Sequence, residues 1–149
     1  MSEQSPEKLL AQFRATLQPV LNKSAESGNA DASAIKSMDA ITMDDMVLFD
    51  RMVGMARQLA VCTDAVAATE LFARFKDGMR ELKIVKTSIS TDGEGNRLLE
   101  DQYDQNRYMF YSFLGNRFGG LSGEIDLFEG ENDLQMVRTE AAQLISSLQ

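Results

Sequence analysis

Apolar residues recur at helical spacing along most of this chain. The first and last rows comprise Leu10, Phe13, Leu17 and Leu21, and Leu134, Val137, Ala141, Leu144 and Leu148. Two rows lie between them: Ala68, Leu71, Phe72, Phe75, Met79 and Leu82, and Leu99, Tyr103, Phe110 and Phe113. Steps of three and four residues place side chains on one face of a helix. The pattern predicts a mainly α fold, an irregular bundle of about five helices, and the length of 149 residues predicts a single domain.

Caps and breaker residues predict where the helices begin and end. Ser5 and Pro6 suit the cap and first position of a helix, whereas Pro19 lacks a backbone donor and predicts a kink or an end nearby. Residues 22–33 contain almost no large apolar side chain and predict a mobile linker after the first helix. Residues 115–124 contain four glycines and predict a loop.

Two segments are ambiguous between helix and strand. Residues 84–90 are rich in β-branched side chains, so we expect at most a short β element there. Residues 106–114 carry apolar and aromatic side chains on both faces, so helix and strand both stay open for them.

The segment from Met46 to Cys62 is apolar around much of its circumference. Thr42, with Asp45 three residues later, predicts a capping-box-like start to this helix. Its apolar residues cover an arc of roughly 220°, whereas a helix on a globular surface needs a stripe of about 100° or somewhat more. Five of the nine methionines lie between residues 38 and 55, and methionine adapts to irregular gaps and varied partners. The helix is therefore either central in the core or covered on its second side by a partner.

Negative charge is concentrated in the last 60 residues. Residues 1–89 carry 12 acidic and 11 basic side chains, whereas residues 90–149 carry 11 acidic and 4 basic ones. This asymmetry favours a solvated acidic surface, and its functional interpretation is attraction to a basic partner or mimicry of a nucleic acid. Direct nucleic-acid binding is disfavoured, because contacts to phosphates need a concentrated basic face.

The patterns that suggest chemistry each lack a necessary residue. The stretch from Asp92 to Tyr103 begins with alternating oxygen ligands, as a calcium loop does, but Arg97 and Tyr103 replace the required glycine and glutamate. The chain has no histidine and one cysteine, Cys62, so it lacks the ligands of a structural zinc site and the commonest general base. We therefore expect a protein that is not an enzyme and holds no metal or cofactor, although carboxylates that converge in space would leave no signal in spacing.

The composition also predicts a compartment. No run of about 20 apolar residues occurs, so we expect no membrane-spanning helix. The polar residues 2–8 are not followed by the apolar run of a signal peptide, and the single cysteine fits a reducing compartment. The expectation is a cytoplasmic protein.

The best functional hypothesis is a non-enzymatic protein-binding module, such as an adaptor, a secretion-type chaperone or an inhibitor. The methionine-rich helix would bury an apolar segment of another protein, and the acidic half would select a basic one. The candidate contacts are Leu48, Met52, Met55 and Leu59 on the apolar side, and Glu124, Asp126, Glu129, Glu131 and Asp133 on the acidic side.

Two alternatives stay open. The seven-residue spacing in the first and last helices suggests a structural subunit that assembles through paired terminal helices, whereas a homodimer would instead use the methionine-rich helix as its dimer face. An acidic mimic of nucleic acid that blocks a DNA-binding protein is the other alternative.

Overall fold

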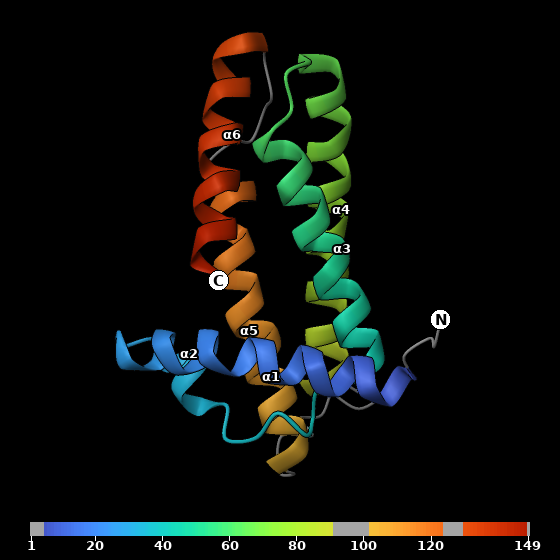
Figure 1. Cartoon of the computed structure of the whole chain (residues 1–149), viewed down its shortest axis with the longest axis vertical. Helices are drawn as coiled ribbons and strands as arrows, with labels where there is room; N and C mark the ends of the chain where they lie inside the picture. The colour runs from blue at the N-terminus through green and yellow to red at the C-terminus, as the bar shows by residue number, and fades with distance from the viewer. Residues whose placement is uncertain (1–4, 91–101, 124–129, 149) are drawn as a thin grey trace. The chain divides into compact units, whose positions relative to one another are not determined.

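The computed structural model of the chain describes residues 5–90, 102–123 and 130–148. These residues contain no β-strand, and the predicted mainly α fold is confirmed (Figure 1). The helices are α1 (Pro6–Glu26), α2 (Ala30–Ala34), α3 (Met43–Ala60), α4 (Ala65–Ser90), α5 (Gln102–Gly123) and α6 (Gly130–Ser147).

Helix α1 begins where the cap residues predict. The Ser5 hydroxyl accepts a hydrogen bond from the Lys8 backbone N–H at 3.2 Å, and Pro6 occupies the first helical position. Pro19 does not end the helix, which continues to Glu26. Pro19 is exposed, and burial of Leu17, Val20 and Leu21 on the inner face offsets the lost backbone hydrogen bond.

Residues 22–33, predicted to be a linker, are largely helical. Residues 22–26 complete α1, and residues 30–33 belong to α2. Gly28 makes the turn between them with φ of 94°, a conformation that favours glycine. Asn29 then caps α2 by accepting a hydrogen bond from the Ala32 N–H at 2.9 Å. The segment lacks large apolar side chains, which suggested a linker, but these local hydrogen bonds and the turn define its structure. The mobility of the segment stays a prediction.

The two ambiguous segments and the described part of the predicted loop are all helical. Residues 84–90 continue α4 instead of forming a β element, because the intrinsic preference against β-branched residues in a helix is only a few tenths of a kcal/mol. Residues 106–114 are helical within α5. Residues 115–123, predicted to be a loop, extend the same helix. The buried side chains of Phe118 and Leu121 outweigh the cost of the glycines, about 1 kcal/mol for each.

The chain divides into two compact units. Unit 1 comprises Met1–Val47 and Val85–Phe113. Its described part holds α1 and α2, which contact each other, the start of α3, the end of α4 and the first half of α5. Its buried apolar side chains are Leu17, Val20, Leu21, Ala32, Met38, Ala40, Ile41, Met46, Ile89, Phe110, Tyr111 and Phe113.

Polar side chains secure the connection between α2 and α3 within unit 1. The Arg14 guanidinium on α1 donates to the carbonyl oxygens of Asp39 at 3.0 Å and Ile41 at 3.2 Å. The backbone N–H of Lys36 donates to the side-chain oxygen of buried Asn106 on α5 at 2.8 Å. The connecting segment is therefore held at both ends by helices distant in sequence.

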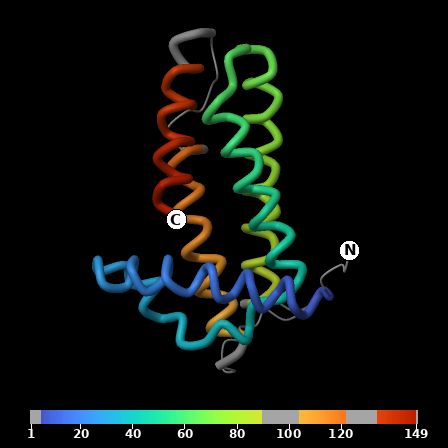
Figure 2. Tube along the Cα trace, viewed as in Figure 1, coloured from blue at the N-terminus to red at the C-terminus, as the bar shows by residue number. Residues whose placement is uncertain are grey.

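Unit 2 comprises Leu48–Ile84 and Leu114–Gln149. Its helical segments, from α3, α4, α5 and α6, run alternately in opposite directions (Figure 2). The Phe118 ring lies 6.1 Å from the ring of Phe49 and 5.9 Å from that of Phe75, both edge to face. Phe118 thus connects α3, α4 and α5 inside the core of this unit.

The close approach of α3 and α4 at Gly78 is testable. A methyl group at residue 78 would overlap the Sδ atom of Met52 and lie 3.2 Å from its Cε atom. Met52 is fully buried and has little room to move aside. We expect Gly78→Ala to lower the free energy of unfolding by about 1–2 kcal/mol, because overpacking outweighs the helix propensity that alanine gains.

Gly54→Ala is the matched control, since a methyl group there would meet nothing within 4 Å. At this position alanine should raise the free energy of unfolding by up to about 1 kcal/mol. Urea denaturation measures both values. A Gly78→Ala variant more stable than the wild type would show that the two helices are not in tight contact there.

Candidate functional site

The four predicted apolar contacts on α3 fall into two groups. Leu48, Met52 and Leu59 are buried within the chain, whereas Met55 is half-buried. Burial within the chain therefore accounts for much of the wide apolar arc of this helix. Of the two interpretations of the methionine-rich helix, burial favours a place in the core. Among the four candidates only Met55 keeps surface for a partner, and Val47 on the same helix is 56% exposed.

The five acidic candidates are mostly outside the described residues. Glu124, Asp126 and Glu129 lie outside them entirely. Glu131 and Asp133 belong to the first turn of α6, where only the backbone is described. Their electrostatic contact with a partner stays a prediction.

The apolar seams of the terminal helices are largely used inside the chain. Leu17 and Leu21 of α1 are buried in unit 1. The buried seam of α6 in unit 2 comprises Leu134, Val137, Ala141 and Leu144. Of the two predicted seams, Leu10, Phe13 and Leu148 are half-buried, so pairing of these helices between copies would depend on them or on side chains outside the seams.

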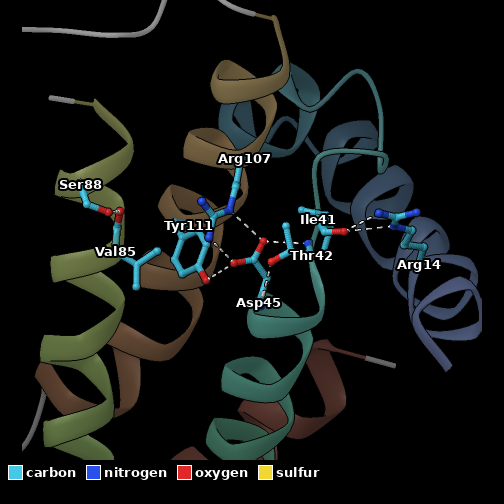
Figure 3. A network of polar contacts seen from close by, with 8 residues as sticks. All are labelled: Arg14, Ile41, Thr42, Asp45, Val85, Ser88, Arg107 and Tyr111. Atoms are coloured by element: carbon cyan, nitrogen blue, oxygen red, sulfur yellow. Dashed lines mark hydrogen bonds and ion pairs between the residues drawn. The ribbon is translucent and has the colours of Figure 1, made fainter. Parts of the chain in front are cut away.

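A buried carboxylate lies at the centre of a polar cluster in unit 1 (Figure 3). The Asp45 side chain is fully buried. Arg107 donates to both carboxylate oxygens, from Nε to Oδ2 at 3.0 Å and from Nη2 to Oδ1 at 2.8 Å. The Tyr111 hydroxyl also donates to Oδ1, and the Thr42 backbone N–H donates to Oδ2 at 2.9 Å. Four donors thus satisfy this carboxylate.

Local sequence positions both sides of this cluster. Asp45 accepts from the Thr42 N–H while the Thr42 hydroxyl accepts from the Asp45 N–H at 3.3 Å, which confirms the predicted capping box. Arg107 and Tyr111 are four residues apart on α5 and therefore share one face. The guanidinium carbon of Arg107 lies 5.7 Å from the centre of the Tyr111 ring. The sequence analysis did not predict that they pair with Asp45. The sequence signals were an acid in the first turn of an apolar helix and an arginine directly before an aromatic run.

The electrostatics hold each member of the cluster in one protonation state at neutral pH. Burial raises the pKa of Asp45. The hydrogen bonds from Arg107, Tyr111 and Thr42 together lower it by more than burial raises it, so the pKa of Asp45 is below its ordinary value. The hydrogen bond to Asp45 raises the pKa of Arg107 despite burial. Burial, followed by the hydrogen bond to Asp45, raises the pKa of Tyr111. With no member titrating near neutral pH, the cluster acts as a tether between the start of α3 and α5.

Acid should weaken this tether. Asp45 has a lower pKa in the folded chain than in the unfolded chain, so the unfolded state takes up the proton first as the pH falls. The stabilisation by Asp45 is complete well above its ordinary pKa of 3.8 and is lost as the pH falls below about 4. We expect the free energy of unfolding, measured in urea from pH 6 to pH 3, to fall more steeply for the wild type than for Asp45→Asn. Equal slopes would contradict the assignment.

The described residues give no support for a metal site and place the single cysteine outside any such group. Among these residues, no group of three or more histidine, cysteine or acidic side chains could hold a metal ion. Cys62 is half-buried, and its thiol donates to the Asp64 carbonyl at 3.3 Å. Most of the calcium-like stretch 92–103 lies outside the described residues. Of the helices described, none has the length and apolar character to cross a membrane.

Comparison with protein-family models, with curated proteins and with solved structures finds no match to this chain.

Proposed function

We propose that this chain is a non-enzymatic protein-binding module whose partner presents a basic segment. The charge asymmetry carries the proposal, because residues 90–149 hold 11 acidic and only 4 basic side chains. Charge of one sign concentrated in one part of a chain speeds encounter with an oppositely charged partner and disfavours others. Glu124, Asp126, Glu129, Glu131 and Asp133 are the proposed electrostatic contacts.

Two accessible side chains of unit 2 are the proposed apolar contacts. Met55 is half-buried, and Val61, directly after α3, is 72% exposed. Methionine can adjust its shape to different apolar partners. Leu48, Met52 and Leu59 are buried, so this proposal assigns them no direct contact with the partner.

A neutralised variant tests the proposal. Proteins captured on the immobilised chain from its native source are identified by mass spectrometry, and their affinities are then measured across a salt series. The triple variant Glu124→Gln, Asp126→Asn, Glu129→Gln should bind roughly tenfold more weakly and depend less on salt, because it lacks three of the attracting charges. Met55→Gln, which adds no charge, should weaken binding without changing the salt dependence.

The matched control is Glu7→Gln, Glu26→Gln, Asp44→Asn, which removes the same charge from exposed positions of the first half. Equal weakening by both triple variants would show a general charge effect and contradict a specific acidic contact. Duplex DNA added as a competitor separates the nucleic-acid mimic, whose partner it displaces, from the protein-binding module, whose partner it leaves bound.

A further inference from the structure

Helix α4 carries a second row of residues at coiled-coil spacing on its exposed side. The inner row, Ala68, Phe72, Phe75 and Leu82, is buried in the core of unit 2. The outer row is Val66, Glu70, Ala73, Asp77, Arg80 and Ile84, in alternating steps of four and three residues. All six are exposed, and they fall within an arc of roughly 80°. One helix therefore presents two opposite seams, and within the described residues the chain buries only the inner one.

The ends of this outer row are apolar. Val66 and Ile84 are each 69% exposed, and they stand about 27 Å apart along the helix. Single exposed apolar residues are ordinary on a protein surface. Here, however, they occupy the two ends of one heptad row, and charged residues lie between them.

The row is complementary to itself when it is reversed. Residues equally far from position 75 form the pairs Val66 with Ile84, Glu70 with Arg80, and Ala73 with Asp77, of which the central pair sets a small side chain opposite an acid. In an antiparallel pair of identical helices centred there, each Glu70 faces an Arg80 of the other copy, and each Val66 faces an Ile84. A parallel pair would instead oppose glutamate to glutamate and arginine to arginine. The charges therefore favour a two-fold, antiparallel arrangement.

The charged members of the row are available for such contacts. Arg80 pairs with Asp77 at 2.9 Å, but both side chains remain largely exposed, at 76% and 66%. Exposed pairs of this kind contribute little stability, so Arg80 can exchange this partner at small cost. Glu81, by contrast, lies beside the row and is paired with Arg51 of α3.

We propose that a second copy of this chain docks antiparallel on the outer face of α4, with the two-fold axis beside residue 75. Two Glu70–Arg80 ion pairs set the register, and two Val66–Ile84 contacts close the ends of the seam. A single helical seam is small compared with the roughly 800 Å² that each partner of a stable complex buries. The dimer is therefore weak and forms with rising concentration. This inference is independent of the proposed basic partner.

Charge exchange tests the pairing. Sedimentation velocity from about 5 µM to about 500 µM should show a monomer–dimer equilibrium for the wild type. Glu70→Arg and Arg80→Glu should each weaken association by roughly tenfold to hundredfold, because each variant opposes like charges twice in its dimer. Mixing the two variants should restore association, since both ion pairs re-form in the heterodimer. The double variant Glu70→Arg, Arg80→Glu should also associate as the wild type does.

The apolar ends have a matched control on another helix. Ile84→Asp should abolish association, whereas Met136→Asp, at a 47% exposed position on α6, should leave it unchanged. Circular dichroism checks that each variant keeps its helices. A wild type that stays monomeric throughout the series would overturn the proposal. So would mixed variants that fail to associate, or a dimer that Met136→Asp disrupts as strongly as Ile84→Asp.

Discussion

Replacing Asp45 by alanine should lower the free energy of unfolding by about 3–5 kcal/mol. The substitution removes a fully buried carboxylate and leaves the charge of Arg107, whose side chain is 25% exposed, without its counter-charge. It also removes the acceptor for the Tyr111 hydroxyl and the side chain that caps the start of α3. A small domain is stable by only about 5–15 kcal/mol, so the variant should be partly unfolded under mild denaturing conditions. Urea denaturation followed by circular dichroism measures the loss.

The adjacent Asp44 provides the control for Asp45. It lies in the same first turn of α3 but is exposed. Asp44→Ala should therefore cost less than about 1 kcal/mol, which is the favourable interaction of an exposed acid with the helix dipole. Asp45→Asn should fall between the two, because it keeps one acceptor oxygen and loses the charge. Similar costs for Asp44→Ala and Asp45→Ala would show that the cluster does not hold the helices together.

Replacing Met52 by glutamate should unfold the chain at 25 °C. Met52 is fully buried in unit 2, and its Sδ and Cε atoms fill the space beside Gly78 of α4. Loss of a buried methionine alone costs about 2–5 kcal/mol, and burial of an unpaired polar or charged group adds several kcal/mol more. The sum approaches the whole stability of a domain of this size. Loss of the helical circular dichroism signal and of the cooperative thermal transition would report the unfolding.

Met55→Glu is the control on the same helix. Met55 is half-buried, so a carboxylate at this position can reach water. We expect a folded variant that loses about 1 kcal/mol. A Met52→Glu variant as stable as the Met55→Glu variant would show that Met52 is not part of the core. It would then support the predicted contact of Met52 with a partner.

Short-range chemistry made the helix starts predictable. Ser5, Thr42 and Asp45 each accept a hydrogen bond from a backbone N–H three residues away. Because the partners are so close in sequence, their spacing alone predicts the cap. The helical rows were predictable for the same reason, because the repeat of a helix decides which side chains share a face.

Weak local preferences misled the prediction where tertiary packing opposed them. The β-branched residues at 84–90 and the glycines at 115–123 each disfavour a helix by about 1 kcal/mol or less. Buried side chains in the same segments, including Ile89, Phe118 and Leu121, contribute more than that when they join the core. A sum over local preferences therefore placed a β element and a loop where α4 and α5 continue.

The candidate site was only partly accessible from sequence. Asp45 was visible as half of a cap, but Arg107 and Tyr111 lie 62 and 66 residues away along the chain. No spacing rule connects residues so far apart. The outer row of α4 was present in the sequence, yet it became distinguishable from the inner row only when burial showed which face the chain itself covers.

By itself, the sequence determined the α-helical class, the helix faces and the accumulation of negative charge after residue 90, because these depend on composition and on the repeat of one helix. Only the tertiary structure decided that Met52 is core while Met55 keeps some surface, and that four donors surround Asp45. Burial and long-range hydrogen bonds are properties of the neighbours that folding brings to a side chain. Those neighbours come from other helices, so the pattern along any one helix does not specify them.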